Sequence, residues 1–391
     1  MSDSNGSAAE VFRVFLKLGL TSFGGPVAHL GYFREELVVR RRWLTDAAYA
    51  DLVALCQFLP GPTSSQAGFA VGLTRAGWAG AAAAFVGFTL PSALIMLAFA
   101  MAAPGVGGPF GEGLLHGLKL VAVAIVAQAL WGMARSLTPD APRVAIAVVA
   151  IAVLMLAPGA VAMMVAILIG AVAGLMLRET GAGRAGGPVS LPVSARIGWI
   201  AAVGFLALLV LLPLLAEAVP GLALADSFYR AGSLVFGGGH VVLPLLDAEM
   251  VQTGRVSADQ FLAGYGAAQA LPGPLFTFAA YLGTVVGASF WAGLMALAAI
   301  FLPGFLILIA ALPFWSRFRQ ESVAQRMMQG SNAAVVGILA AALYDPVFVS
   351  AVHGVADLAL AVGCFALLML RVPPWVVVVL AECGGIGLAL V

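Results

Sequence analysis

The sequence predicts an all-α polytopic membrane protein with two homologous halves in inverted topology. Each half is expected to contain broken or re-entrant helices, and one extra transmembrane helix is expected between the halves. Of 391 residues, 62% are hydrophobic and only 9% are charged, against about 25% charged in an ordinary soluble domain. Apolar runs longer than about 18 residues, enough to cross a bilayer, recur along the chain. The third observation is an internal repeat.

The repeat is clearest in the segment from Phe15 to Glu36, which returns 213 residues later as Phe228 to Glu249. Both copies carry one cation in an apolar helix, then a glycine break, then a glutamate. The cation is Lys17 in the first copy and Arg230 in the second. Other matches follow at an offset of 212 or 213, among them a Gln-x-Leu-Pro-Gly-Pro motif at 57–62 and at 269–274. An offset held over so many motifs indicates two copies of one unit.

In chain order, the first half begins with the helix that carries Lys17 and breaks at residues 23–26. Arg34, Arg40, Arg41 and Arg42 follow, a density of positive charge typical of a cytoplasmic loop. The Thr45-Asp46 pair predicts the start of a helix that stops at residues 60–62, where a second short helix begins. Each piece has about a dozen residues, too few to cross about 30 Å of hydrocarbon. We therefore expect a re-entrant hairpin or a discontinuous helix here.

Nine full spans are expected in the whole chain. In the first half they cover residues 78–101, 112–135, 143–157 and 160–177, four more repeat them in the second half, and an extra span covers 197–216. The domains predicted from this pattern are an N-terminal transporter repeat at 1–178, a basic linker with the connecting helix at 179–224, and a C-terminal repeat at 225–391. One extra span between two copies inverts the second copy, and nearly all loop arginines then fall on one side, as the positive-inside rule requires.

The two matched cations, Lys17 and Arg230, are the first candidates for a binding site. An ionisable side chain deep in a membrane is costly and is usually functional, and two cations at matched positions of inverted repeats could converge on one anion. In such transporters the site lies near mid-membrane, where broken helices of both repeats meet. The alternative is that both cations lie near helix ends and extend to the membrane interface.

The broken helices supply the other candidates. A helix that begins after Pro-Gly-Pro directs unpaired N–H groups at whatever precedes it, which suits an anion. Hydroxyl and amide side chains lie beside the breaks, and glycines there allow close backbone approach, although close helix packing explains a single glycine equally well. The further substrate-binding candidates are Ser22, Gly24, Gly25, Gln57, Gly61, Thr63, Ser64, Gly237, Gly238, Gly239, Gln269, Gly273 and Thr277.

Four titratable residues are candidates for carrying a coupling proton. Glu36 and Glu249 are matched carboxylates, whereas His29 and His240 lie nearby at positions that do not match. Histidine titrates near neutral pH, but a plain interfacial role is an equal alternative. We find no phosphate loop, nucleophile constellation or metal-ligand cluster. The sequence therefore predicts a protein that is not an enzyme and has no cofactor, no metal and no nucleic-acid partner.

The stretches FLKLGLTSFGGPVAHLGYFREE and QFLPGPTSSQ, with their echoes FGGGHVVLPLLDAE and QALPGP, resemble the chromate ion transporter family in its long two-domain form. The resemblance covers essentially the whole chain. It implies a protein of the bacterial inner membrane that exports chromate and confers chromate resistance. The loop charges and the inverted repeat predict a multi-pass protein with its N-terminus in the cytoplasm and its C-terminus in the periplasm. The residues alone indicate only a secondary transporter of a small oxyanion in contact with membrane lipid. Two alternatives stay open: the substrate is sulfate or another small oxyanion, or the protein is an anion channel. A homodimeric state also stays open.

Overall fold

The computed structural model describes residues 6–103, 108–157, 159–177, 193–236, 239–315 and 321–390, apart from the side chains of Val27 and Pro220. Within these ranges all regular structure is helical and there is no strand. In a bilayer every backbone N–H and C=O has to be paired inside the protein, and a helix does this within one segment. The predicted all-α fold class is confirmed.

The helices of the first half follow the predicted order. They are α1 (Ala8–Thr21), α2 (Gly25–Phe33), the π-helical turn η1 (Arg34–Arg40), α3 (Asp46–Phe58), α4 (Thr63–Ala102), α5 (Gly108–Leu137), α6 (Ala141–Leu156) and α7 (Ala160–Gly174). The extra helix between the halves is α8 (Ala195–Ala218). The second half contains α9 (Pro220–Ser233), η3 (Gly239–Val241), α10 (Val242–Met250), α11 (Ala258–Ala270), η4 (Leu275–Thr277), α12 (Phe278–Gly287), α13 (Phe290–Ala311), η5 (Leu312–Phe314), α15 (Ser322–Ala342), η6 (Leu343–Phe348), α16 (Val349–Ala351), α17 (Val355–Met369) and α18 (Pro374–Ala389).

The helices break where glycine and proline predict. Gly24 (φ 94°) and Gly25 (φ 78°) take up left-handed backbone between α1 and α2, a conformation that only glycine adopts at low cost. Gly61 (φ 121°) turns the chain between α3 and α4, and Gly273 (φ 99°) turns it between α11 and η4. The backbone of α4 is itself not helical at Ala76 and Gly77, so a short helix at residues 63–75 precedes the long one. The half-helices predicted on both sides of each Pro-Gly-Pro motif are therefore present.

Five described helical segments are long and apolar enough to cross a membrane. They are Thr63–Ala102, Gly108–Leu137, Ala195–Ala218, Phe290–Phe314 and Ser322–Ala351. The four helices α6, α7, α17 and α18 have only 15 or 16 residues, about 24 Å at 1.5 Å per residue. By length, five of the nine expected spans are full helices. The other four form two hairpins of short helices.

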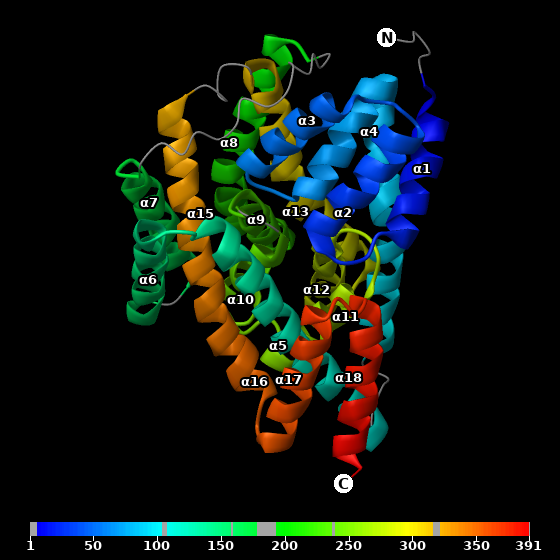
Figure 1. Cartoon of the computed structure of the whole chain (residues 1–391), viewed down its shortest axis with the longest axis vertical. Coiled ribbons are helices and arrows are strands. Elements are labelled where there is room, and N and C mark those ends of the chain that lie inside the picture. The colour runs from blue at the N-terminus through cyan, green and yellow to red at the C-terminus, as the bar shows by residue number, and fades with distance from the viewer. Residues whose placement is uncertain are drawn as a thin grey trace.

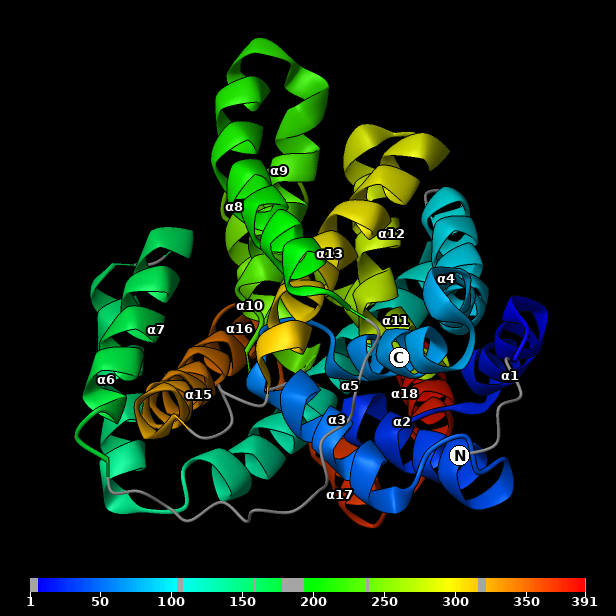
Figure 2. The same ribbon diagram turned by 90° about the horizontal axis from the view of Figure 1, so that it is seen from above.

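The two halves are interlocked through these short hairpins. Figures 1 and 2 show α6 and α7 of the first half beside α15 of the second, and α17 and α18 of the second half beside α5 of the first. Glycines permit the contact: a Cβ at Gly117 of α5 would lie 2.3 Å from the carbonyl of Ala381, and one at Gly330 of α15 would lie 2.0 Å from that of Gly170. Because Gly117 and Gly330 are matched positions, each half packs its short hairpin against the other half in the same way.

The extra helix α8 lies at the periphery. Figure 2 shows it projecting with α9 from the rest of the helices, where α9 and α13 are its packing partners. Only 6% of its most apolar 18-residue window is buried inside the protein. Such an apolar and uncovered helix is typical of a segment that faces lipid.

Candidate functional site

The two halves meet at their glycine breaks. Pro26 and Gly239 are matched positions of the repeat, and a Cβ at Gly239 would lie 3.1 Å from Pro26 Cγ. A Cβ at Gly25 would lie 3.5 Å from His240 Nε2. Two matched residues touch only near the axis that relates the halves, so this axis passes close to Pro26. We call the segments around this contact, residues 22–29, 59–65, 239–241 and 265–277 together with Val235, the junction.

Backbone hydrogen bonds exchanged between the halves hold the junction together. The N–H of Gly61 donates to the carbonyl of Val235 at 2.7 Å, and the N–H of Gly273 donates to the carbonyl of Ser22 at 2.9 Å. Gly61 matches Gly273, and Ser22 matches Val235. Each Pro-Gly-Pro turn therefore binds the residue just before the other half's glycine break. Buried backbone groups in apolar surroundings have to be paired, and here that requirement fixes the four breaks relative to one another.

Two histidines lie at the junction, one from each half. The Nδ1 atom of His29 lies 3.3 Å from the hydroxyl of Ser64. The Nδ1 atom of His240 lies 3.0 Å from the hydroxyl of Tyr265 and 3.4 Å from Nε2 of Gln269. A neutral imidazole offers one donor and one acceptor, and a protonated one offers two donors. Each neutral imidazole can therefore present one N–H group to a ligand.

The first turn of α4 adds further donors. The helix begins after Pro62 without a side-chain cap, and the first N–H groups of a helix are the positive end of its dipole. The hydroxyls of Ser22 and Ser65 are buried and have no hydrogen-bond partner among the described residues. Thr277, which matches Ser65, instead donates to the carbonyl of Pro274 at 2.9 Å. Burying a hydroxyl without a partner is unfavourable, so this side of the junction favours a ligand rich in acceptor oxygens.

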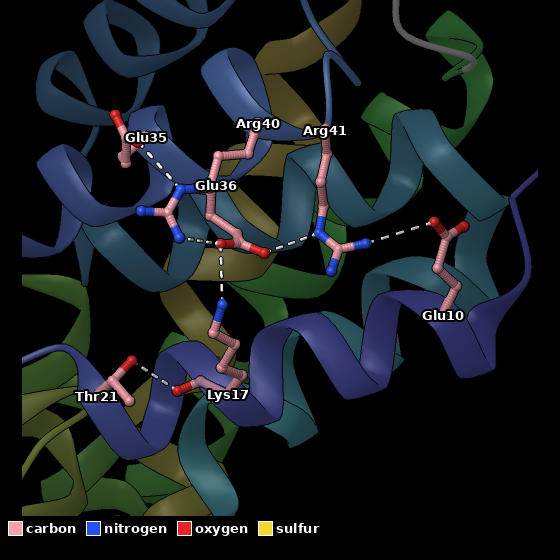
Figure 3. A network of polar contacts seen from close by, with 7 residues as sticks. All are labelled: Glu10, Lys17, Thr21, Glu35, Glu36, Arg40 and Arg41. Carbon is pink, nitrogen blue, oxygen red and sulfur yellow. Dashed lines mark hydrogen bonds and ion pairs between the residues drawn. The ribbon is translucent and has the colours of Figure 1, made fainter.

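Lys17 lies in an ion-pair network of the first half, which Figure 3 shows. Its ammonium is 3.1 Å from Oε2 of Glu36, whose other oxygen is 2.9 Å from Nε of Arg41. Arg40 and Glu10 extend the network at 3.7 Å from Glu36 and 3.8 Å from Arg41. Burial raises the pKa of the Glu36 carboxyl, but hydrogen bonds from Arg41 and Lys17 outweigh this and hold the pKa below its ordinary value. Glu36 is thus a carboxylate shared by several cations.

The second half contains the matched ion pair. Arg230 lies 3.1 Å from Glu249 and 2.8 Å from Asp226. The Arg230–Glu249 distance equals that between their first-half counterparts. In each half, the same pair ties the first helix to the segment that follows the glycine break. The two cations therefore lie in separate networks, each with carboxylates of its own half.

Comparison with known proteins decides the family. The chromate transporter family matches residues 9–175 and again residues 222–388. The chain belongs to the chromate transporter family. The chromate transport protein of Pseudomonas aeruginosa is 29% identical over 401 residues, which covers 97% of this chain and 92% of the relative. The chromate transport protein of Cupriavidus metallidurans is 28% identical over 347 residues, or 85% of this chain and 81% of the relative. No solved structure matches the chain.

Family membership confirms the resemblance and the two-half organisation, and it places the chain among membrane transporters. In this transporter, most of the predicted site residues come together at the junction: Ser22, Gly24, Gly25, His29, Gly61, Thr63, Ser64, Gly239, His240, Gln269, Gly273 and Thr277. They come from both halves. Residues that are more than 200 positions apart in the sequence therefore lie side by side at the junction.

Other predicted residues lie elsewhere. Gln57 is exposed near the end of α3, although its match Gln269 contacts His240. Gly237 and Gly238 lie outside the described residues. Lys17, Arg230, Glu36 and Glu249 belong to the ion-pair networks described above.

Two contributors were missed in the sequence. Tyr265 bonds His240, but its matched residue is Val53, so the repeat gave no signal for it. Asp226 pairs with Arg230 one helical turn away. The spacing of four residues between an acid and a base in one helix was the available signal.

Proposed function

We propose that this protein is a secondary active transporter that exports chromate across the bacterial inner membrane by alternating access and so confers chromate resistance. The observation that carries the proposal is the junction, where the buried, unpartnered hydroxyls of Ser22 and Ser65 lie in segments that exchange backbone hydrogen bonds with the second half. The names of the two curated relatives, both chromate transport proteins, support chromate as the substrate. Two repeats that meet around one polar point can rock about it, which is the usual principle of such transporters.

The junction suits a tetrahedral dianion. Chromate has four acceptor oxygens, and the first N–H groups of α4, the hydroxyls of Ser22, Ser64 and Ser65, and an imidazole N–H of His29 are donors. Charge-assisted hydrogen bonds to an anion are roughly twice as strong as neutral ones. A site made of N–H groups and hydroxyls lowers the barrier for a dianion without holding it as tightly as a set of fixed cations.

Lys17 and Arg230 take a different part in this proposal. Each one locks the first helix of its half to the segment after the glycine break through Glu36 or Glu249. An arriving anion competes with the carboxylate for the cation, so the pair can open when substrate enters. A proton on Glu36 or Glu249 would loosen these ion pairs, and a proton on His29 or His240 would change the hydrogen bonds of the junction; coupling to protons would act in one of these two ways.

The proposed orientation is inverted, with the N-terminus in the cytoplasm and the C-terminus in the periplasm. In Figure 1, α1 and α18 lie toward opposite ends of the longest axis. Arg42 and Arg255 are exposed matched residues, so inverted halves place them on opposite sides of the membrane. Impermeant thiol reagents should label Arg42→Cys and Arg255→Cys in opposite vesicle orientations, in a background without Cys383. Labelling of both from the same side would overturn the inverted arrangement.

Membrane potential is a sufficient energy source for export. Moving one charge through 100 mV corresponds to about 2.3 kcal/mol, so a dianion that leaves a negative interior gains roughly twice that. No nucleotide is needed for this step, and a proton that enters in exchange for the dianion would add to the energy gained.

Sulfate is the rival substrate, because hydroxyls and N–H groups recognise tetrahedral oxyanions in general. The test is uptake of radiolabelled chromate into everted vesicles under an imposed potential, with and without excess sulfate. Potential-driven uptake that excess sulfate does not suppress supports chromate export, whereas suppression by excess sulfate favours the broader oxyanion transporter. Ion currents at channel rates would replace the transporter by an anion channel. Vesicles that take up no more chromate than empty controls would refute the proposal.

A further inference from the structure

A cavity of about 650 Å³ lies away from the junction, at the ends of α4 and α12 and the beginnings of α5, α11 and α13. Ala100 at the end of α4 lines it. Ala100 belongs to the span that begins at Trp78. Just before that residue, Arg75 pairs with Glu10, which also pairs with Arg41; we call the network of Lys17, Glu36, Arg40, Arg41, Glu10 and Arg75 the arginine-rich network. The 25 residues from Trp78 to Ala102 cover about 36 Å at 1.5 Å per residue. The cavity therefore lies near the membrane face opposite the arginine-rich network.

Two basic residues line the cavity, Lys119 and His116, and His116 already pairs with Asp357 at 2.8 Å. Lys119 has a side chain that is 12% exposed, and its ammonium lies 2.9 Å from Oδ1 of Asp259, whose side chain is 68% exposed. Glu112, near the beginning of α5, also lines the cavity. Lys119 is seven residues further along α5, about 10 Å deeper into the protein along the helix axis. A buried ammonium needs a partner, whereas a carboxylate at the surface loses little when water replaces the lysine. Asp259 is therefore an exchangeable partner.

We propose that Lys119 forms an anion subsite in this cavity, where a tetrahedral oxyanion replaces Asp259 as its partner on the way between the junction and the solvent. The proposal rests on the proposed function, because it assumes that an oxyanion crosses the junction. Glu112 and Asp259 line the same cavity, and both repel a dianion when ionised. The ammonium is thus the group to which an anion in this cavity binds.

Aromatic contacts connect the subsite to the junction. Tyr281 lines the cavity and stacks on Phe99 at 5.4 Å. Phe278 contacts Tyr281 at 6.1 Å and Tyr265 at 5.7 Å between ring centroids, and the hydroxyl of Tyr265 bonds His240 at the junction. A continuous series of ring contacts thus runs from the cavity to the histidine at the junction.

The subsite belongs to one half only. The residue that matches Lys119 is Asn332, which cannot supply a positive charge. The counterpart of Tyr281 is Phe69, which stacks on Phe305 at 4.8 Å. A charged subsite on one side only gives the two faces of the transporter different affinities for the anion, which a transporter with a preferred direction can use.

The test is the dissociation constant of radiolabelled chromate, and separately of sulfate, measured on purified full-length variants. Lys119→Gln should raise it about tenfold, the effect of losing one hydrogen bond to a charged group. Asp259→Asn should lower it severalfold, because the competing carboxylate is gone. Lys119→Arg keeps the charge and should bind nearly as well as wild type. Arg34→Gln removes a positive charge from an exposed ion pair in the first half and should change nothing.

The outcomes separate this proposal from the proposed function. Opposite shifts in Lys119→Gln and Asp259→Asn support the subsite. Equal weakening by both variants means that the ion pair is structural, and unchanged affinity in both means that the anion does not visit Lys119; either result overturns the subsite while chromate transport stands. Wild-type protein that binds neither anion overturns the proposed function itself, and the subsite with it.

Discussion

Replacing Arg230 by methionine should destabilise the transporter more than replacing its matched residue Lys17. Arg230 pairs with both Asp226 and Glu249, whose side chains are 9% and 10% exposed, so its loss strands two buried carboxylates. Breaking a buried ion pair costs about 3–5 kcal/mol. The Arg230 side chain is itself 35% exposed, and solvent screening reduces the expected loss to about 2 kcal/mol.

The matched change Lys17→Met should cost less. The Lys17 side chain is 54% exposed, and Glu36 keeps its hydrogen bond from Arg41 at 2.9 Å. Exposed ion pairs contribute about 0.2–1 kcal/mol. The structure therefore predicts unequal effects at two positions that the repeat makes equivalent.

The assay is thermal unfolding of the purified variants in one detergent, monitored by the loss of monodisperse protein. Arg230→Lys, which keeps the charge, should recover most of the stability lost in Arg230→Met. Equal losses in Lys17→Met and Arg230→Met, or a larger loss in Lys17→Met, would refute the reasoning, because burial of the partner carboxylates would then not decide the cost.

Three further predictions follow from the junction and its surroundings. Gly273→Ala should reduce both the folded yield and the chromate flux, because φ at Gly273 is 99° and the new Cβ would lie 2.9 Å from Oγ of Ser92. The control Gly204→Ala has nothing within 4 Å of its new Cβ and should match wild type. Equal yields of the two variants would contradict this prediction. Ser64→Ala should raise the chromate concentration for half-maximal flux about fivefold, the effect of one hydrogen bond worth about 1 kcal/mol, since His29 loses its partner; an unchanged value would exclude the pair from the site. Thermal stability of wild type should fall as pH drops below 4.5, the ordinary pKa of glutamate, because a carboxylate with a lowered folded-state pKa stabilises the fold only while ionised. Glu36→Gln should lose less over the same range, and an equal loss would contradict the assignment.

The repeat allowed much of the fold to be predicted from the sequence. Matching Pro-Gly-Pro and glycine motifs located the broken helices, because proline and left-handed glycine interrupt a helix whatever surrounds them. The short hairpin helices were located as well: the apolar stretches 143–157 and 160–177 correspond to α6 and α7, which have 16 and 15 residues. Their composition is that of a full span, and it does not reveal that they pack as a hairpin against the other half.

The junction shows why a site is harder to predict than a fold. Matching positions in the repeat suggested that Lys17 and Arg230 act together, yet each cation pairs with the matched glutamate of its own half. Local spacing could not show this, because helix ends and breaks decide which side chains meet. The asymmetric pairs His29–Ser64 and His240–Tyr265 have no counterpart in the other half. The repeat therefore contains no signal for these pairs.

The most direct test of the central claim, that an oxyanion binds at the junction, uses the variant Ser22→Ala/Ser65→Ala. Both hydroxyls are buried without a partner among the described residues, so removing them should leave the empty protein as stable as wild type or more so. Chromate affinity and thermal stability would be measured on the same purified samples. The account predicts weaker chromate binding with no loss of stability. Unchanged affinity in an equally stable variant would show that the anion binds elsewhere.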